Sequence, residues 1–297
     1  MKTFFAKREC PSCGCRHDPA YLSCPKCGAQ TDDPDALSIF KKQIPVPWWK
    51  NLIFFLTGLI GLSILATIIS IIVELSFIAG HPGATTDDLI QYLSSADANF
   101  AVSGTAYLLL TVALSLVLWK SWKHIGKSFA SWVPFVAAII GYACIYGFNL
   151  FYNLIMELCY QAAGRPLPGV NANESALRAM ALAYPALALI VFGLLGPLCE
   201  EITYRIGLFG FLSRFGRVLA YILTAVVFGF IHFAWGSLFS PSYPGQALDE
   251  LANLPPYIFA GLVFGFLYDR FGFAASFTAH FTNNLISLIV TITLPGK

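Results

Sequence analysis

Charged residues are scarce in this sequence. Asp, Glu, Lys and Arg make up only 11% of its 297 residues, and hydrophobic residues make up 57%, whereas charged residues account for roughly 25% of an ordinary soluble domain. The formal net charge of +2 is too small to indicate a nucleic-acid partner. The composition therefore argues against a soluble enzyme and predicts a protein embedded in a lipid bilayer.

Two further features are missing. Residues 1–8 lead into cysteines and not into the apolar core of a secretory signal peptide, so we expect the N-terminus to stay in the cytoplasm. No internal repeat is present, which weighs against transporters built from duplicated halves. What remains is a single membrane domain whose function has to be sought in its polar residues.

Cysteines gather at the N-terminus in two CxxC pairs. The pairs are separated by ten residues, and a glycine follows each one. In a reducing compartment this spacing favours metal over disulfides, and four thiolates suit one tetrahedral zinc ion. We predict a zinc-ribbon over residues 1–30 and a linker over residues 31–47. The expected ligands of the structural zinc are Cys10, Cys13, Cys24 and Cys27.

Seven apolar segments follow the linker, and each is close to the length of about 20 residues that a helix needs to cross a bilayer. They lie near residues 51–79, 100–119, 130–159, 180–213, 218–236, 254–268 and 272–294. The fourth could form two pieces, because Gly193, Gly196 and Pro197 weaken helix continuity. The predicted fold is an all-α polytopic membrane domain over residues 48–297, with about seven transmembrane helices and with its ends on opposite sides of the membrane.

The loops between these segments alternate in charge. Lysine and arginine, which concentrate on the cytoplasmic side, occur in alternate loops at Lys120, Lys123, Lys127, Arg214, Arg217 and Arg270. The loops at residues 81–99 and 236–253 contain neither residue type, and only the connection at residues 160–178 departs from the pattern. We therefore predict an integral membrane protein with a cytoplasmic N-terminus and an external C-terminus.

Ionisable residues interrupt three of the apolar segments. Such residues cost at least ~2.5 kcal/mol at the centre of a membrane helix, so each one suggests a function. Glu201 and Arg205 are four residues apart and share a helix face, where an ion pair can offset their desolvation. Glu200 is rotated by about 100° and has no such partner. We therefore expect Glu200 to be the carboxylate that is free to act as a general base.

The polar residues of the three segments lie at similar depths. Along its own helix, each of Glu200, His232 and Asn284 lies roughly 21 to 23 Å from a basic residue that marks the cytoplasmic end of that segment. His280 precedes Asn284 by four residues and shares its helix face. A single membrane histidine is more often an ordinary buried residue, but this combination at one depth predicts a shared polar cavity.

At these residues the sequence resembles the CPBP family of intramembrane peptidases, which includes the type II CAAX prenyl endopeptidases and bacterial proteins linked to bacteriocin processing or immunity. Three family motifs occur in order, EExxxR at residues 200–205, FxxxH at residues 228–232 and HxxxN at residues 280–284. The resemblance covers a peptidase core at about residues 180–290, and the zinc-ribbon lies outside it. Because family members often have an eighth helix, eight helices are the alternative to seven.

The resemblance implies a glutamic-type endopeptidase that needs no metal at its active centre. Glu200, helped by His232, would activate a water, while His280 and Asn284 would stabilise the oxyanion. The residues that would shape the site are Glu201, Arg205 and Phe228. The expected substrate is a membrane-associated peptide or protein, of which a prenylated or CAAX-like peptide is one option.

Three other functions are compatible with the sequence. A membrane metalloprotease could use Glu and His as zinc ligands, although the HExxH motif is absent. A catalytically silent scaffold or bacteriocin-immunity-like protein could recruit a cytosolic partner through the zinc-ribbon. A proton-coupled transporter is disfavoured by the missing repeat. The scaffold, unlike the peptidase, would keep its function without the Glu200 carboxylate.

Overall fold

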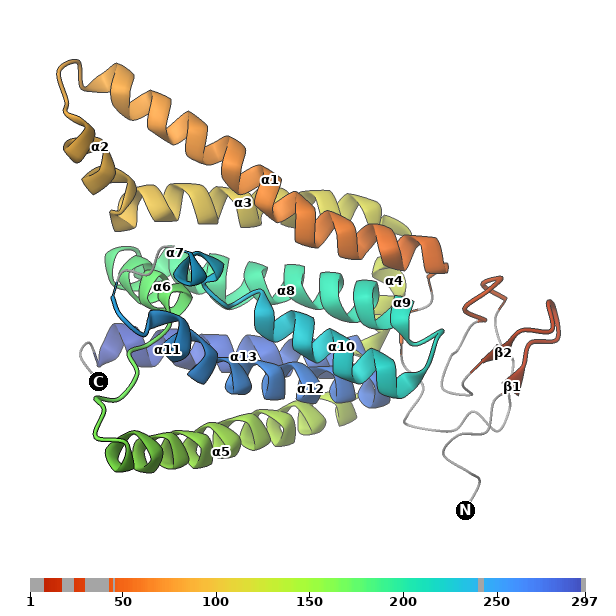
Figure 1. The fold of residues 1–297 in the computed structure, drawn as a ribbon. Coiled ribbons are helices and arrows are strands. Elements are labelled where there is room, and N and C mark those ends of the chain that lie inside the picture. Colours follow the sequence, from red (N-terminus) through yellow and green to blue (C-terminus); the bar gives the residue numbers. More distant parts are fainter. Residues whose placement is uncertain (1–7, 18–23, 30–42, 45, 240–242, 295–297) are drawn as a thin grey trace.

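The computed structural model describes residues 8–17, 24–29, 43–44, 46–239 and 243–294. Most of the predicted linker, residues 31–42 and 45, lies outside this part of the chain. Within the described residues, seven long helical segments run side by side and alternate in direction (Figure 1). They are α1 (Trp48–Gly80), α3 (Ala96–Val117), α5 (Val133–Ala162), the run from α7 to α9 (Pro185–Leu212), α10 (Arg217–Phe230), α12 (Leu254–Phe271) and α13 (Phe273–Thr293).

These helices match the seven predicted segments and the predicted all-α membrane class. By length and composition, five of the helical segments in the described chain can cross a membrane: α1, α3, α5, the α7–α9 run and α12 with the short helix before it. The apolar helix α10 is shorter, with 14 residues, and α13 has 21 residues that include His280 and Asn284. The protein is thus built as an integral membrane protein.

Short elements connect the helices at the two ends of the bundle (Figure 1). The proximal end, where α1 begins, carries η1 (Trp119–Ser121) and α4 (Trp122–Ser128). The distal end, where α13 ends, carries α2 (Thr86–Leu93), α6 (Ala172–Ala183), η4 (Trp235–Leu238) and α11 (Gln246–Ala252). The loops rich in lysine and arginine lie at the proximal end, and its assignment to the cytoplasmic side stays a prediction.

The fourth segment runs as one helix and begins later than predicted. Residue 180 belongs to α6, and the spanning helix starts at Pro185, because a residue before proline is disfavoured in the α conformation and Tyr184 accordingly leaves it. Its successive pieces are α7 (Pro185–Ile190), the π-helical turn η2 (Val191–Leu195), α8 (Gly196–Glu200), the π-helical η3 (Glu201–Phe209) and α9 (Gly210–Leu212). Pro197 has no N–H to continue the regular ladder, and the wider turn before it keeps the helix in one piece.

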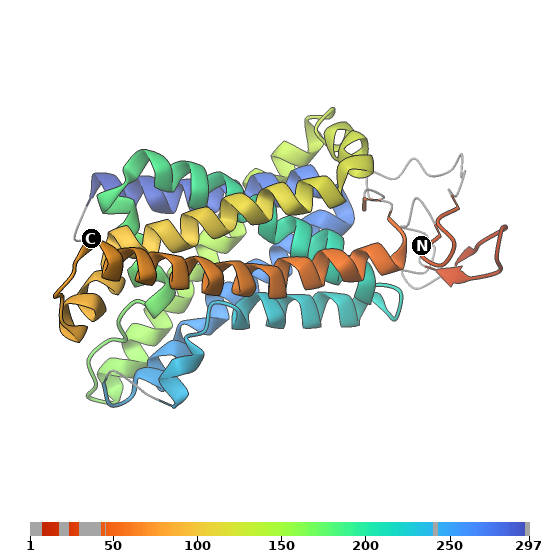
Figure 2. The same ribbon diagram turned by 90° about the horizontal axis from the view of Figure 1, so that it is seen from above.

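Close contacts at glycines hold the site-bearing helix and its neighbours together. A Cβ atom on Gly58 of α1 would lie 1.8 Å from Oγ1 of Thr203 in η3, so the two helices meet at this point only because residue 58 is glycine. A Cβ atom on Gly261 of α12 would lie 3.0 Å from Cα of Ala225 in α10. Figure 2 shows α1 and α3 crossing the bundle from one end to the other, with α13 extending alongside.

Candidate active site

The N-terminal cysteines form a candidate metal centre apart from the bundle's cavity. The sulfur atoms of the four predicted ligands all lie within 4.8 Å of one another. Four sulfurs bound tetrahedrally to zinc at about 2.3 Å would be about 3.8 Å apart. The Sγ–Sγ distances are 3.7 Å for Cys10 and Cys27 and 3.5 Å for Cys13 and Cys24, which fits that spacing. The four thiols can therefore hold one metal ion.

Local backbone geometry brings these thiols together. Strands β1 (Arg8–Glu9) and β2 (Arg16–His17) pair antiparallel around the first CxxC turn. Gly14 and Gly28 adopt φ angles of 65° and 74°, and their amides donate hydrogen bonds to the carbonyls of Cys10 and Cys24. Burial raises the pKa of Cys10, but hydrogen bonds from backbone amides of its turn and from the thiols of Cys24 and Cys27 outweigh burial and lower its pKa to about 7, while the pKa values of the other three thiols are raised. A thiol that ionises near neutral pH is well suited to bind metal.

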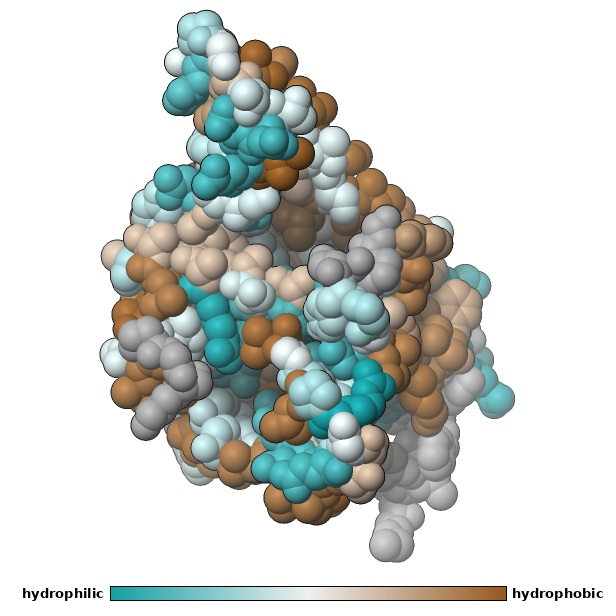
Figure 3. Space-filling model, turned by 60° about the vertical axis from the view of Figure 1, so that its left-hand side comes forward, coloured by the Kyte–Doolittle hydropathy of each residue, from teal (hydrophilic) through white to brown (hydrophobic). Residues whose placement is uncertain are grey.

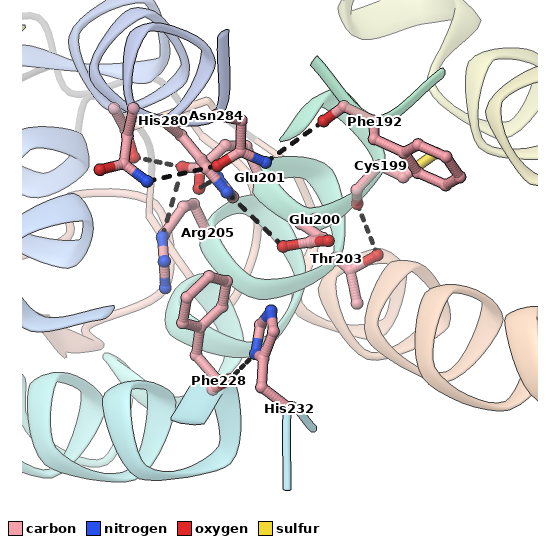
Figure 4. A network of polar contacts seen from close by, with 12 residues as sticks. Phe192, Cys199, Glu200, Glu201, Thr203, Arg205, Phe228, His232, His280 and Asn284 are labelled. Atoms are coloured by element: carbon pink, nitrogen blue, oxygen red, sulfur yellow. Dashed lines mark hydrogen bonds and ion pairs between the residues drawn. The ribbon is translucent and has the colours of Figure 1, made fainter. Parts of the chain in front are cut away.

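Inside the bundle, the adjacent residues Glu200 and Glu201 have different surroundings (Figure 4). Glu201 is fully buried and lies 3.3 Å from Nε of Arg205, which is also fully buried. Ser276 of α13 donates a hydrogen bond to the Oε2 atom of Glu201. The guanidinium of Arg205 lies over the ring of Phe228, with its carbon 4.9 Å from the ring centre. Glu201 therefore has its charge compensated by fixed partners, as the four-residue spacing predicted.

His280 connects the two carboxylates. Its Nδ1 atom lies 2.9 Å from Oε1 of Glu201, and its Nε2 atom lies 3.7 Å from Oε2 of Glu200. The Nδ1 atom donates to the ion-paired carboxylate of Glu201, so Nε2 is the nitrogen that faces Glu200. The ring also stacks on Phe264 of α12, at 4.5 Å between ring centres. Its orientation is thus fixed from two sides.

Glu200 has one oxygen engaged and one available. Tyr107 of α3 donates a hydrogen bond of 3.2 Å to the Oε1 atom of Glu200. The Oε2 atom is buried and has no hydrogen-bond partner within the described chain. A water molecule that contacts Oε2 could also contact Nε2 of His280, because the two atoms are 3.7 Å apart. One water molecule can thus contact both a proton acceptor, Glu200, and a second polar group, His280.

His232 lies just beyond α10 and not within it, because the helix ends at Phe230, earlier than the predicted residue 236. Its Nδ1 atom lies 2.9 Å from the carbonyl oxygen of Phe228. A carbonyl can only accept, so Nδ1 carries the hydrogen and Nε2 of the neutral ring is an acceptor. The ring stacks on Tyr257, with centres 4.3 Å apart. Figure 4 shows the free edge of this ring directed toward Glu200.

Phe228 and Asn284 also contact this group of residues. The Phe228 ring is buried and lies 5.2 Å from the ring of His232 and 5.7 Å from that of His280. Asn284 donates a hydrogen bond of 3.2 Å from Nδ2 to the carbonyl of Phe192 in η2. One of the two amide hydrogens of Asn284 is therefore engaged with the protein, and the other is left for a ligand.

A cavity of about 600 Å³ joins these residues. Glu200, His232, His280 and Asn284 all line it, together with side chains of α3, α5, α6 and α12. Figure 3, which looks toward the distal end, shows hydrophilic residues gathered in a hollow of this surface. The structure thus brings the four predicted catalytic residues to one polar cavity within the bundle.

Three polar contacts of this site were not predicted from the sequence. They involve Tyr107, whose hydroxyl meets Glu200, Ser276, which meets Glu201, and Tyr257, which stacks on His232. Ser276 precedes His280 by four residues, so the helical spacing held a signal for it. Tyr107 is a polar residue inside an apolar segment, but nothing in its own segment indicates which carboxylate it meets.

Comparisons with known proteins agree with the sequence motifs. Residues 182–286 match the family described as type II CAAX prenyl endopeptidase Rce1-like, and this stretch contains all four predicted catalytic residues. An uncharacterized protein of Mycoplasma capricolum subsp. capricolum is 29% identical over 111 residues, which cover 37% of this chain and 29% of that protein. No solved structure matches the chain. The chain therefore carries an Rce1-like domain.

Proposed function

From the Rce1-like domain at residues 182–286, we propose that this protein is an intramembrane endopeptidase that hydrolyses a peptide bond of a membrane-associated substrate with a water activated by Glu200. One observation carries the proposal: the Oε2 atom of Glu200 is buried without a hydrogen-bond partner in the described chain and borders a cavity that two histidines also line. A prenylated or CAAX-like peptide is one candidate substrate.

The proposed chemistry uses Glu200 twice. Its carboxylate takes a proton from water, and the resulting hydroxide attacks the carbonyl carbon of the scissile peptide bond. Nε2 of His232, the acceptor of that ring, helps to orient the water through its second hydrogen. Glu200 then gives its proton to the amide nitrogen as the tetrahedral intermediate collapses, so that a carboxylic acid and an amine leave the site.

The negative charge on the tetrahedral oxygen needs donors. Asn284 has one amide hydrogen that is not used by Phe192, and Nε2 of His280 donates in the ring form that carries a hydrogen on both nitrogens. Glu201, Arg205 and Ser276 keep His280 in place and do not contact the substrate in this scheme. The mechanism assigns no step to a metal ion.

We assign a structural role to the ribbon, with zinc as the metal that four cysteines in this arrangement favour. When bound, the metal supplies the folding energy that so small a unit lacks in its own core. A cytosolic partner of the ribbon is compatible with this role. A catalytically silent scaffold stays the alternative to the peptidase, and no contact among the described residues of the cavity favours it.

Cleavage by a Glu200→Gln variant tests the mechanism. General-base catalysis contributes roughly 10²–10⁴-fold, so we expect the cleavage rate of a membrane-embedded reporter peptide to fall by that factor in purified protein reconstituted into lipid. The matched control is Glu157→Gln on α5, which removes an exposed carboxylate that only accepts from Gln161. Cleavage by Glu200→Gln at the wild-type rate would reject Glu200 as the general base, whereas no cleavage by the wild-type protein would favour the scaffold.

A further inference from the structure

The cavity is closed toward the proximal end. All nine residues of η3 (Glu201–Phe209) are buried, and they lie directly beyond Glu200 in that direction. The large side chains around them, Phe54, Tyr268 and Phe273, are also almost fully buried. A peptide cannot pass through this packed layer, so the proximal end offers no route to Glu200.

The cavity extends from Glu200 only toward the distal end. Its lining on α5 begins at Tyr142 and continues toward the distal end as far as Asn153, in the middle third of that helix. Its lining on α13 begins at His280 and continues to Thr291, near the last residue of that helix. The residues of α6 border the same space. Figure 3 shows the hydrophilic hollow at this end.

Uncharged polar side chains form stripes along this route. On α5, Tyr142, Tyr146, Asn149 and Asn153 follow spacings of four, three and four residues and share one helix face. On α13, Ser287 and Thr291 continue the face of His280. The Oδ1 atom of Asn149 is buried without a hydrogen-bond partner in the described chain, so it can accept from a water molecule or from a ligand group in the cavity.

Net charge is nearly absent from the lining. The charged side chains among the described residues of the cavity are Glu174, Arg178 and Glu200. The first two form an ion pair at 2.9 Å, which leaves only the carboxylate at the floor. A charged substrate side chain along the walls would lose its hydration without gaining a counter-charge there, whereas side-chain amides can donate to and accept from a peptide backbone.

We infer that the cavity takes its substrate from the distal end as an extended, uncharged peptide segment, whose backbone is hydrogen-bonded by the amide side chains of the lining. On the predicted topology this is the external side of the membrane. The inference deepens the proposed function and rests on it. From His280 to Thr291 is roughly 17 Å along α13, which an extended chain covers in about five residues. The scissile bond thus lies about five residues from the mouth.

Thiol labelling tests the direction of access without any need for cleavage. Ser287→Cys in the full chain is treated with a membrane-impermeant maleimide on one face of sealed vesicles, and modified peptides are identified by mass, which separates them from native cysteines. Lys127→Cys on α4 marks the proximal face. We expect the two cysteines to react from opposite faces. Reaction of Ser287→Cys from the face of Lys127→Cys, or from neither face, overturns the inference.

Kinetics test the recognition of the peptide. The probe is a terminally blocked ten-residue peptide of Ala, Leu, Asn and Thr, compared with the same peptide carrying two lysines on one side of the scissile bond. The double variant Asn149→Leu, Asn153→Leu should raise KM for the uncharged probe roughly tenfold with little change in kcat. Leu154→Ala, at an exposed apolar residue of the same helix, is the control. Unchanged KM, or equal cleavage of the lysine peptide, contradicts the inference.

Binding without cleavage separates this inference from the proposed function. In a Glu200→Gln background, the uncharged probe should protect Ser287→Cys from the maleimide, and the lysine peptide should not. If Glu200→Gln cleaves normally, the proposed mechanism fails, while protection still supports the peptide-binding cavity. If Glu200→Gln is inactive but the probe does not protect, the mechanism survives and the inferred peptide route is wrong.

Discussion

The proximal and distal halves of the helical domain meet at the peptide bond between Glu200 and Glu201, and the two carboxylates have different surroundings. On the proximal side, Glu201 is fully buried, paired with Arg205 and bonded to His280. On the distal side, Glu200 borders an open polar cavity and keeps one oxygen without a partner in the described chain. Adjacent carboxylates of one helix can therefore have separate roles, one in stability and one in catalysis. Successive residues of a helix point in different directions, so the two carboxylates have different neighbours.

The largest effect should come from the proximal half. Removing one partner of a buried ion pair leaves an uncompensated charge and costs about 3–5 kcal/mol. We therefore expect Glu201→Gln to lower the unfolding free energy by that amount and to slow cleavage, since His280 loses its charged acceptor. Thermal unfolding in lipid or detergent measures the change.

The control for this variant removes both charges. Glu201→Met combined with Arg205→Met should regain most of the lost stability but not the activity, because neither charge of the pair is left buried alone and His280 has lost the acceptor of its Nδ1 hydrogen. If Glu201→Gln were as stable as the wild type, Glu201 would have no structural role that distinguishes it from Glu200.

A second test of the proximal half changes its packing. A Cβ atom at Gly58 would overlap Oγ1, Cγ2 and Cβ of Thr203, so no rotation of that side chain relieves the contact. We expect Gly58→Ala to destabilise the protein by about 1–3 kcal/mol. Gly61→Ala on the same helix is the matched control, because its Cβ would make an ordinary contact at 3.7 Å. Equal unfolding temperatures of the two variants would show that the packing at residue 58 is not tight.

Substitutions in the distal half should change the cleavage rate and not the stability of the protein. Tyr107→Phe removes the hydroxyl that donates to Glu200. Hydrogen bonds to charged groups contribute about 1.5–3 kcal/mol, so we expect kcat to fall roughly tenfold or more while KM and the unfolding temperature stay near wild type. Tyr184→Phe, which removes an exposed hydroxyl bonded to Asp97, is the control. A loss of stability without a loss of kcat would assign Tyr107 to packing alone.

The smallest effect on cleavage should come from the ribbon. Wild-type protein should bind one metal ion per chain, measured by elemental analysis, and Cys10→Ser with Cys27→Ser should bind none. Metal should also be lost as pH falls, because protons compete for the thiolates. We expect the variant to cleave within about twofold of wild type and to be insensitive to chelators. If a chelator stops its cleavage and zinc restores it, the metalloprotease alternative is correct.

Much of the site could be predicted because its motifs are local. The four-residue spacings predicted that Glu201 shares a helix face with Arg205 and that His280 shares one with Asn284, because the helical repeat is about 3.6 residues. The bond between His280 and Glu201 could not be read in this way, since it joins residues 79 apart in the chain. The pattern also missed the end of α10 at Phe230, because an apolar run continued beyond the last helical turn.

The sequence by itself determined the apolar segments, the two CxxC turns and the order of the polar motifs, since each depends on residues close together in the chain. Only the tertiary structure decided which end of the cavity is open, that Tyr107 meets Glu200, and that α5 contributes a stripe of tyrosine and asparagine side chains. These features depend on how separate helices are rotated and tilted against one another. Lipid-facing apolar residues impose little restriction on that choice, whereas glycine contacts and buried polar partners fix it.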